Sequence, residues 1–444
     1  MSLPPLFAPQ STPRVFATPP GVDAAHALAT GFRVRLGEGP PERWARCTVY
    51  LNAQRSAKAF ARALRTGPAH LLPRLLTIDG LAAQQGLFAA QTPLARTLDL
   101  TALVAKLLEA DPSLGVAQNA FDLAESLSAL LDEMAVEGVT VAQLRTLPPD
   151  ALQQHWQKSL AFLDLVTGQE ARLGLGEASS VLQARAVAQQ IEAWAASPPD
   201  QPVLAAGSTA SRRPTADLLA AIAHLPQGAV ILPGLDRTLP LDAVDQLVEA
   251  QSPTLDHPQA MMVRFLDRLG LRPSEVPLWG ETALEGAPRQ ALISLALRPA
   301  PVTDGWLRDG PALRDTLGPA TAKISLVEAP TQQAEADTLA WAIRSALHRG
   351  KTVALVSADR GLTRRVQAAL LRWQIEADDS AGRPLQQTPP GVFLRLVLSA
   401  LDGAPAPAIL AALLKHPITA TGALAESGTA EDADSTRSTH LKRV

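Results

Sequence analysis

A Gly-Lys-Thr triplet at residues 350–352 is the group whose residue types most directly suggest chemistry. In phosphate-binding loops such a triplet ends the pattern G-x-x-x-x-G-K-[ST], between a strand and the helix whose N-terminus faces the phosphates. Here Ser345 occupies the first glycine position, and the apolar run "TVALVS" follows the triplet instead of preceding it. The order is reversed, so we interpret Gly350 as a helix C-cap and Lys351 as the lead-in to a strand.

The place where a phosphate loop would belong is "TPPGVDAA" (18–25), directly after the first predicted strand. This loop has one glycine, no lysine and no Ser or Thr positioned to hold magnesium. The stretch "LAAGSTAS" (204–211), where a metal-holding acidic strand end is expected, has no carboxylate. The sequence therefore predicts no ATP site and no phosphoryl transfer by this chain.

Basic residues recur at helical spacing in two places. Arg55, Lys58, Arg62 and Arg65 fall at i, i+3, i+7 and i+10, which is one stripe of a helix directly after a predicted strand. Such a stripe fits a phosphate backbone, which it would position without reading sequence, and the alternative is a solvated helix face. Arg360, Arg364 and Arg365, with Arg372 nearby, form a second group with the same two interpretations.

Three smaller features carry weaker signals. Ser208 and Thr209 lie between a predicted strand and a helix, where hydroxyls bind an anion or a DNA phosphate, or cap the helix. Asp378 and Asp379 are adjacent carboxylates without a third ligand, a pattern more typical of a turn than of a metal site. Cys47 is the only cysteine, which excludes an internal disulfide and a cysteine-ligated cluster, so we expect no cofactor in this chain.

Length and composition limit the class of protein. The chain has 444 residues, which favours two or three domains, and 47% hydrophobic with 19% charged residues suits globular folding. The net charge of −3 means that a nucleic-acid site has to be a local patch. There is no secretory signal pattern and no long apolar run, so we expect a soluble, cytoplasmic protein without membrane contact.

In the first part of the chain, predicted strands and helices alternate, and these elements position the residues named above. Apolar runs at 14–18, 47–51 and 74–79 alternate with helical segments, which predicts a parallel sheet covered by helices in a part ending near residue 92. Residues 93–198 are predicted to be a helical insertion. The strand–helix alternation resumes over 199–300, with strands at 202–207 and 229–234.

The remaining sequence predicts a linker, a second unit and a tail. Pro- and Gly-rich residues 301–320 are expected to be the linker. Over 321–417, "KISLVEA", "TVALVSA" and "QIEADD" are predicted strands, separated by two one-faced helices. Residues 418–444 are poor in large apolar residues and are expected to be a disordered, aberrant tail. The helix before this tail leads us to expect a chain that stops in mid-domain, as a truncated or frame-shifted product does.

Several stretches together resemble the AddB family, in the branch that lacks the phosphate loop. They are "RVFATPPGVD" (14–23), "TVYLNAQRSAKAF" (48–60), "AAGSTASRRPTADLLAAIAHLPQGAVILPGLD" (205–236), "HPQAMMVRFLDRLG" (257–270), "LALRPAPVTDGW" (295–306) and the long match over 324–347 and 351–396. The most specific part runs from "RRVQAALLRW" to "DDSAGRPL" (364–385). The resemblance covers about residues 14–417. It implies an α/β fold of two RecA-like domains of the UvrD helicase type, the first carrying the helical insertion and the second starting near residue 321.

The resemblance also implies partners and a function. AddB proteins pair with AddA, which supplies the motor with its ATP and magnesium and a nuclease, in the AddAB complex that processes DNA double-strand breaks for homologous recombination. The family's own nuclease domain is held by an iron–sulfur cluster, and this chain has neither the nuclease carboxylates nor the cluster cysteines. We expect an inactive helicase-like part that handles single-stranded DNA at duplex ends and docks AddA. The alternatives are an active ATP-dependent helicase or nuclease subunit, and a scaffold for AddA that does not touch DNA.

Overall fold

The computed structural model describes residues 6–37, 42–66, 70–89, 91–110, 117–146, 178–249, 254–280, 286–402 and 406–419, with single positions between 160 and 168. The contacts between residues divide the chain into two compact units, Met1–Lys323 and Ile324–Val444. The tail predicted over 418–444 lies almost wholly outside the described residues.

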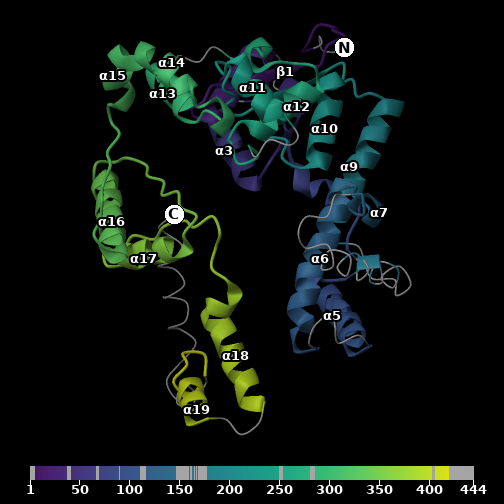
Figure 1. Cartoon of the computed structure of the whole chain (residues 1–444), viewed down its shortest axis with the longest axis vertical. Helices are drawn as coiled ribbons and strands as arrows, with labels where there is room; N and C mark the ends of the chain where they lie inside the picture. Colours follow the sequence, from purple (N-terminus) through teal and green to yellow (C-terminus); the bar gives the residue numbers. More distant parts are fainter. Residues whose placement is uncertain are drawn as a thin grey trace. The chain divides into compact units, whose positions relative to one another are not determined.

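The first unit is built on a five-stranded sheet in the order β1-β5-β4-β2-β3, in which every pairing is parallel. Figure 1 labels β1 and several helices of this unit. Its strands are β1 (Val15–Ala17), β2 (Thr48–Leu51), β3 (Arg74–Thr77), β4 (Val203–Ala206) and β5 (Gly228–Leu232). Four of them lie within apolar runs expected to form strands, and β5 overlaps the fifth run (229–234), beginning one residue before it. The predicted α/β fold with a parallel sheet is therefore confirmed for this unit.

Helices cover both faces of the sheet, as the strand order requires. From β1 to β2 to β3 the chain moves one way across the sheet, through α1 (Ala24–Leu36), α2 (Glu42–Ala45) and α3 (Gln54–Leu64). From β3 to β4 to β5 it moves back, through α9 (Ser179–Ala196) and α10 (Arg213–His224). Because crossovers between parallel strands are right-handed, the two sets of helices fall on opposite faces.

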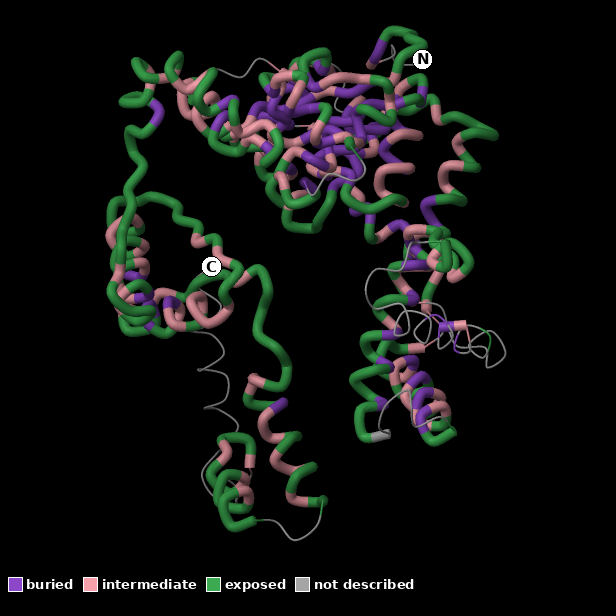
Figure 2. Tube along the Cα trace, viewed as in Figure 1, coloured by how far each residue is buried: buried purple, intermediate pink, exposed green. Residues whose placement is uncertain are grey.

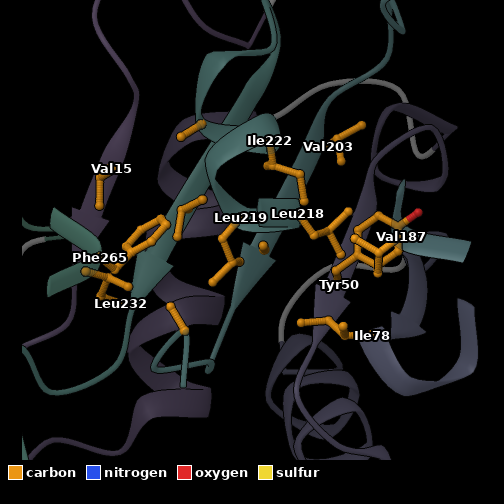
Figure 3. Close-up of a cluster of buried hydrophobic side chains, with 14 of the residues drawn as sticks. Val15, Tyr50, Ile78, Val187, Val203, Leu218, Leu219, Ile222, Leu232 and Phe265 are labelled. Atoms are coloured by element: carbon orange, nitrogen blue, oxygen red, sulfur yellow. The ribbon is translucent and has the colours of Figure 1, made fainter. Parts of the chain in front are cut away.

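The side chains of the strands alternate between these two layers. On β2, Val49 and Leu51 pack among the residues of α1 and α3, whereas Tyr50 faces the other layer with residues of α9 and α10. Figure 3 shows the second layer, in which Leu218, Leu219 and Ile222 of α10 lie over the strands. Burial on both faces explains why the strands are continuous apolar runs in the sequence.

Between β3 and β4 the described residues form helices. After a short 3-10 turn (Ile78–Gly80) come α4 (Leu81–Gln84), α5 (Pro93–Ala110), a turn at Ala117–Asn119, α6 (Ala120–Glu137) and α7 (Val141–Leu144). Arg213, the first residue of α10, donates from Nη1 to the carbonyl oxygen of Glu137 at 2.7 Å. A cation at the C-terminus of α6 suits the helix dipole and joins this helical part to the layer of α10.

The rest of the first unit is helical. It comprises α11 (Leu241–Val248), α12 (Ala260–Arg268), a 3-10 turn (Pro273–Glu275), α13 (Ala287–Ala296), a turn at Ala300–Val302, α14 (Gly305–Asp309), a 3-10 segment (Gly310–Thr316) and α15 (Leu317–Thr321). The expected linker at 301–320 is therefore largely helical. Arg289 of α13 donates from Nε to the carbonyl oxygen of Ala320 at 2.9 Å, and Trp306 donates to that of Leu295. These bonds hold the stretch on the first unit.

The second unit differs from its prediction. It contains α16 (Gln332–His348), α17 (Arg360–Leu371), a 3-10 turn (Leu385–Gln387), α18 (Pro389–Leu401) and α19 (Pro407–Leu414). The apolar faces of α16 and α17 pack together, through Ala336, Ala340 and Val366 among others. No strand forms among the described residues from 324 onward, so the strands predicted in "KISLVEA", "TVALVSA" and "QIEADD" are wrong.

Most residues of these three segments are exposed (Figure 2). Leu326 is 86% and Val356 93% exposed. A strand is defined by hydrogen bonds to a neighbouring strand, and an apolar run without such a neighbour stays an open segment. As to membranes, none of the described helices has the length and apolar character of a membrane span.

Candidate nucleic-acid interface

Helix α3 carries the predicted basic stripe and is firmly packed on its other side. Ala57, Phe60 and Leu64 are buried, and the ring of Phe60 meets that of Phe32 of α1 edge to face at 5.8 Å. Arg33 of α1 donates from Nη2 to the carbonyl oxygen of Thr66 at 2.7 Å, just beyond the C-terminus of α3. The helix is thus held by its apolar face and by a cation at its C-terminal end.

The structure brings the four stripe residues together on the solvent side of this helix. Arg55, Lys58, Arg62 and Arg65 are all exposed. With a rise of about 1.5 Å per residue they cover about 15 Å along the helix. Because α3 begins directly after β2, the stripe starts at the carboxyl edge of the parallel sheet, the edge at which open α/β sheets bind ligands.

The loop after β1 lies at the same edge and presents a negative charge. Asp23 caps α1, where its Oδ1 accepts a hydrogen bond from the backbone N–H of His26 at 3.0 Å. Pro19 and Pro20 have no N–H to donate. In a phosphate loop the start of this helix would face the phosphates, and here the Asp23 carboxylate takes that position. The loop after β1 therefore disfavours the binding of an anion at the start of α1.

The loops after β1, β2, β4 and β5 border a crevice of about 310 Å³, which we call the edge crevice. Asn52 follows β2 and Gly207 follows β4, and a Cβ on Gly207 would lie 3.2 Å from Oδ1 of Asn52. The helices after these adjacent strands, α3 and α10, cover opposite faces of the sheet. The crevice therefore opens where the connections diverge, which is the usual ligand position in such folds.

The residues that line the edge crevice are mostly apolar. Leu28, Leu51 and Ile231 contribute aliphatic surface, while Asn52 and Ser56 contribute polar groups. Asp23 is the only ionisable side chain among the described residues that line it. Sequence reasoning did not find the crevice, because four separate loops form it. The available signal was that Asn52 and Gly207 each follow an apolar run directly.

The hydroxyl residues after β4 do not cap α10. Ser208 is buried, and its Oγ accepts from the backbone N–H of Ala210 at 3.2 Å, which supports the positive φ of 59° at Ala210. Thr209 is half-buried in the same turn. The N-cap of α10 is Arg212. The interpretation of Ser208 and Thr209 as caps of α10 is therefore wrong. The Ser208 hydroxyl oxygen instead stabilises the turn that contains Ala210.

The second basic group is not brought together as one cationic surface. Arg360 forms a two-pronged ion pair with Asp379, with Nη1 to Oδ1 at 3.1 Å and Nη2 to Oδ2 at 2.9 Å. This contact, helped by the backbone N–H of Ala381, lowers the pKa of Asp379 to about 2. Arg364 is exposed and Arg365 half-buried. Arg360 thus stabilises the turn that contains Asp379. Both carboxylate oxygens of Asp379 accept hydrogen bonds from Arg360.

The Gly-Lys-Thr triplet follows α16 as a C-terminal cap. Gly350 has a φ of 69° and donates its N–H to the carbonyl oxygen of Leu347 at 2.9 Å. The Lys351 N–H donates to the carbonyl oxygen of Ala346 at 3.0 Å. This pair of bonds is the Schellman motif. The interpretation of Gly350 as a C-cap is confirmed.

Two other titratable groups in the first unit, Cys47 and His257, have pKa values shifted by burial. Burial raises the pKa of the Cys47 thiol to about 12, which keeps it protonated. Burial also lowers the pKa of His257, whose Nε2 lies 2.8 Å from the carbonyl oxygen of Leu297. In the part of the chain that the structure describes, no three His, Cys, Asp or Glu side chains gather as metal ligands.

Comparison with known proteins adds no relative. Neither the protein-family models nor the curated proteins match this chain.

Proposed function

We propose that this chain is the helicase-like part of an AddB-type subunit, which holds single-stranded DNA near duplex ends and docks AddA in double-strand break repair. The observation that carries the DNA part is the stripe of Arg55, Lys58, Arg62 and Arg65 at the carboxyl edge of an all-parallel sheet. The all-parallel sheet is compatible with a RecA-like domain, and the quoted stretches supply the resemblance to AddB.

The charges at the sheet edge favour a passive role. A motor domain binds the triphosphate at the loop after its first strand, where a lysine and the helix N-terminus meet the phosphates. Here that helix start is capped by Asp23, and the cations lie on the neighbouring helix α3. The proposal therefore assigns ATP hydrolysis to AddA and strand holding to this chain.

A binding experiment with single-stranded DNA tests the stripe. Changing Arg55, Lys58 and Arg62 together to Ala removes three cations from the exposed face of α3. Each phosphate contact on a single strand contributes about 0.7 to the salt slope, so the slope should fall by about 2 if all three contact phosphates. Fluorescence anisotropy of a labelled oligothymidine across a salt series measures both affinity and slope.

A matched variant separates local from general charge effects. Lys106, Arg314 and Lys323 are exposed in the same unit and lie outside α3, and changing them to Ala removes the same net charge. This control should keep the salt slope of the wild type. Equal slopes for the wild type and the stripe variant would remove the stripe from the proposal.

Docking to AddA is tested by co-purification. One observation also favours the alternative in which the chain is a scaffold for AddA that does not touch DNA. The second unit exposes large apolar residues, including Leu326, Val356 and Leu401, a feature typical of surfaces that another chain covers. Co-purification with AddA together with the loss of binding in the stripe variant is the expected result. Co-purification without any binding of single-stranded DNA would replace the proposal with the scaffold, and DNA-stimulated ATP hydrolysis by this chain alone would contradict it.

A further inference from the structure

We propose that the edge crevice receives a base of the same single strand whose phosphates lie on the α3 stripe. This inference rests on the proposed function and adds the chemical group that enters the crevice. The crevice offers about 310 Å³, near the lower end of the range of about 300 to 1,000 Å³ for small-molecule sites.

The stripe and the crevice meet along helix α3. Ser56, Ala59 and Phe60 of α3 line the crevice. Residues three and four apart are neighbours on a helix surface, so Ala59 lies between Arg55 at i−4 and Arg62 at i+3. A strand that follows the stripe therefore passes Ala59, an exposed residue of the crevice lining.

The lining of the crevice suits an uncharged, flat group. Most of its surface is aliphatic, from Leu28, Leu51 and Ile231 among others, and aliphatic walls favour an apolar ring over an ion. The Asp23 carboxylate at the start of α1 repels a phosphate group. A nucleobase has an apolar face and a hydrogen-bonding edge, whereas the phosphates of a strand need cations. The apolar crevice thus suits the base of a nucleotide, and the cationic stripe on α3 suits the phosphates.

Asn52 is the residue placed to meet the edge of a base. It is exposed and lines the crevice next to Gly207, and its amide both donates and accepts hydrogen bonds. Gly207 has a φ of 78° and no side chain, which leaves room for Asn52 in this position. An amide tolerates several bases because each base edge carries donors or acceptors, so we expect insertion with weak base preference.

The test fills the crevice without touching the stripe. Ala59 is exposed and lines the crevice, so Ala59→Leu narrows it with little effect on the core. The probe is an oligothymidine of about twelve nucleotides, compared with the same strand carrying abasic sites. Anisotropy at fixed salt measures the affinity of the full chain for each. Ala195→Leu, at an exposed position of α9, is the matched control.

The expected result is a loss of affinity of about tenfold for the normal strand in Ala59→Leu, with an unchanged salt slope. The abasic strand should bind the wild type about tenfold more weakly and should not distinguish the wild type from the variant. Ala195→Leu should behave as the wild type. Asn52→Ala is a second variant that creates no new bulk, and it should also reduce the difference between the two strands.

Other outcomes separate the two proposals. If Ala59→Leu and Asn52→Ala keep the wild-type affinity while the stripe variant loses it, the base inference is overturned and the proposed function stands. If all variants and the wild type fail to bind the strand, both are overturned. A loss that is equal for normal and abasic strands in Ala59→Leu also overturns the base inference, because it points to the backbone and not to the base.

Discussion

The two units contain apolar runs of the same kind with opposite outcomes. "TVYL" in the first unit is strand β2, paired on both sides by β3 and β4 and buried. "TVALVS" in the second unit forms no strand, and Val356 in it is 93% exposed. The local pattern is alike in both runs. What differs is the presence of neighbouring strands and of helices on both faces, so strand formation here depends on contacts far along the chain.

Hydrogen exchange should show the largest difference between the two units. Amides of β4 and β5 are paired within the sheet and open only with the first unit, whereas amides of residues 353–356 have no strand partner among the described residues. We expect exchange at β4 and β5 to be slower by at least about three orders of magnitude. Mass spectrometry of peptides after timed labelling measures this. Equal protection in the two runs would show that the second run is paired in solution.

A matched pair of leucine truncations should show a smaller difference. Leu204 of β4 is fully buried between the strands and the α1–α3 layer, so Leu204→Ala should lower the free energy of unfolding of the first unit by about 2–5 kcal/mol. Leu326→Ala removes the same atoms from a side chain that is 86% exposed and should change stability by less than about 0.5 kcal/mol. Urea denaturation followed by circular dichroism compares them. A large loss in Leu326→Ala would mean that this side chain is covered in solution.

The smallest effect concerns the ion pair that fixes a turn of the second unit. Arg360 holds the pKa of Asp379 at about 2, below the usual value of about 3.9. A depressed carboxyl pKa contributes stability above the unfolded pKa, so this contribution is present above about pH 4 and is lost as the pH falls toward 2. In Arg360→Gln the pKa of Asp379 should rise toward its usual range.

The pKa of Asp379 is measured from its carboxyl carbon shift by nuclear magnetic resonance. Arg364→Gln, an exposed change on the same helix, is the control and should leave that pKa in place. An unchanged pKa in Arg360→Gln would mean that the backbone N–H of Ala381, and not the guanidinium, holds the carboxylate.

The local parts of the fold were predictable from sequence. The five strands of the first unit lie in short apolar runs flanked by Gly, Pro or polar residues, and the capping role of Gly350 follows from the helix before it. The spacing of Arg55, Lys58, Arg62 and Arg65 placed them on one exposed helix face, because helical periodicity is a local property.

The non-local parts were not predictable. Whether Arg360 faces solvent or a carboxylate depends on Asp379, nineteen residues away in a turn whose path the sequence does not reveal. The edge crevice combines loops that are up to about two hundred residues apart, so its shape appears only once the strand order is known. The strands expected in the second unit were wrong for the same reason, since pairing partners are not encoded in the run itself.

The Asp23 cap has a consequence for attempts to build a nucleotide-hydrolysing enzyme on this scaffold. Grafting a lysine into the turn at residues 18–25 would bring the new ammonium group beside an existing carboxylate, and the two would neutralise each other. Gain of triphosphate affinity would require exchanging the aspartate for a neutral cap and both prolines for residues with free amides.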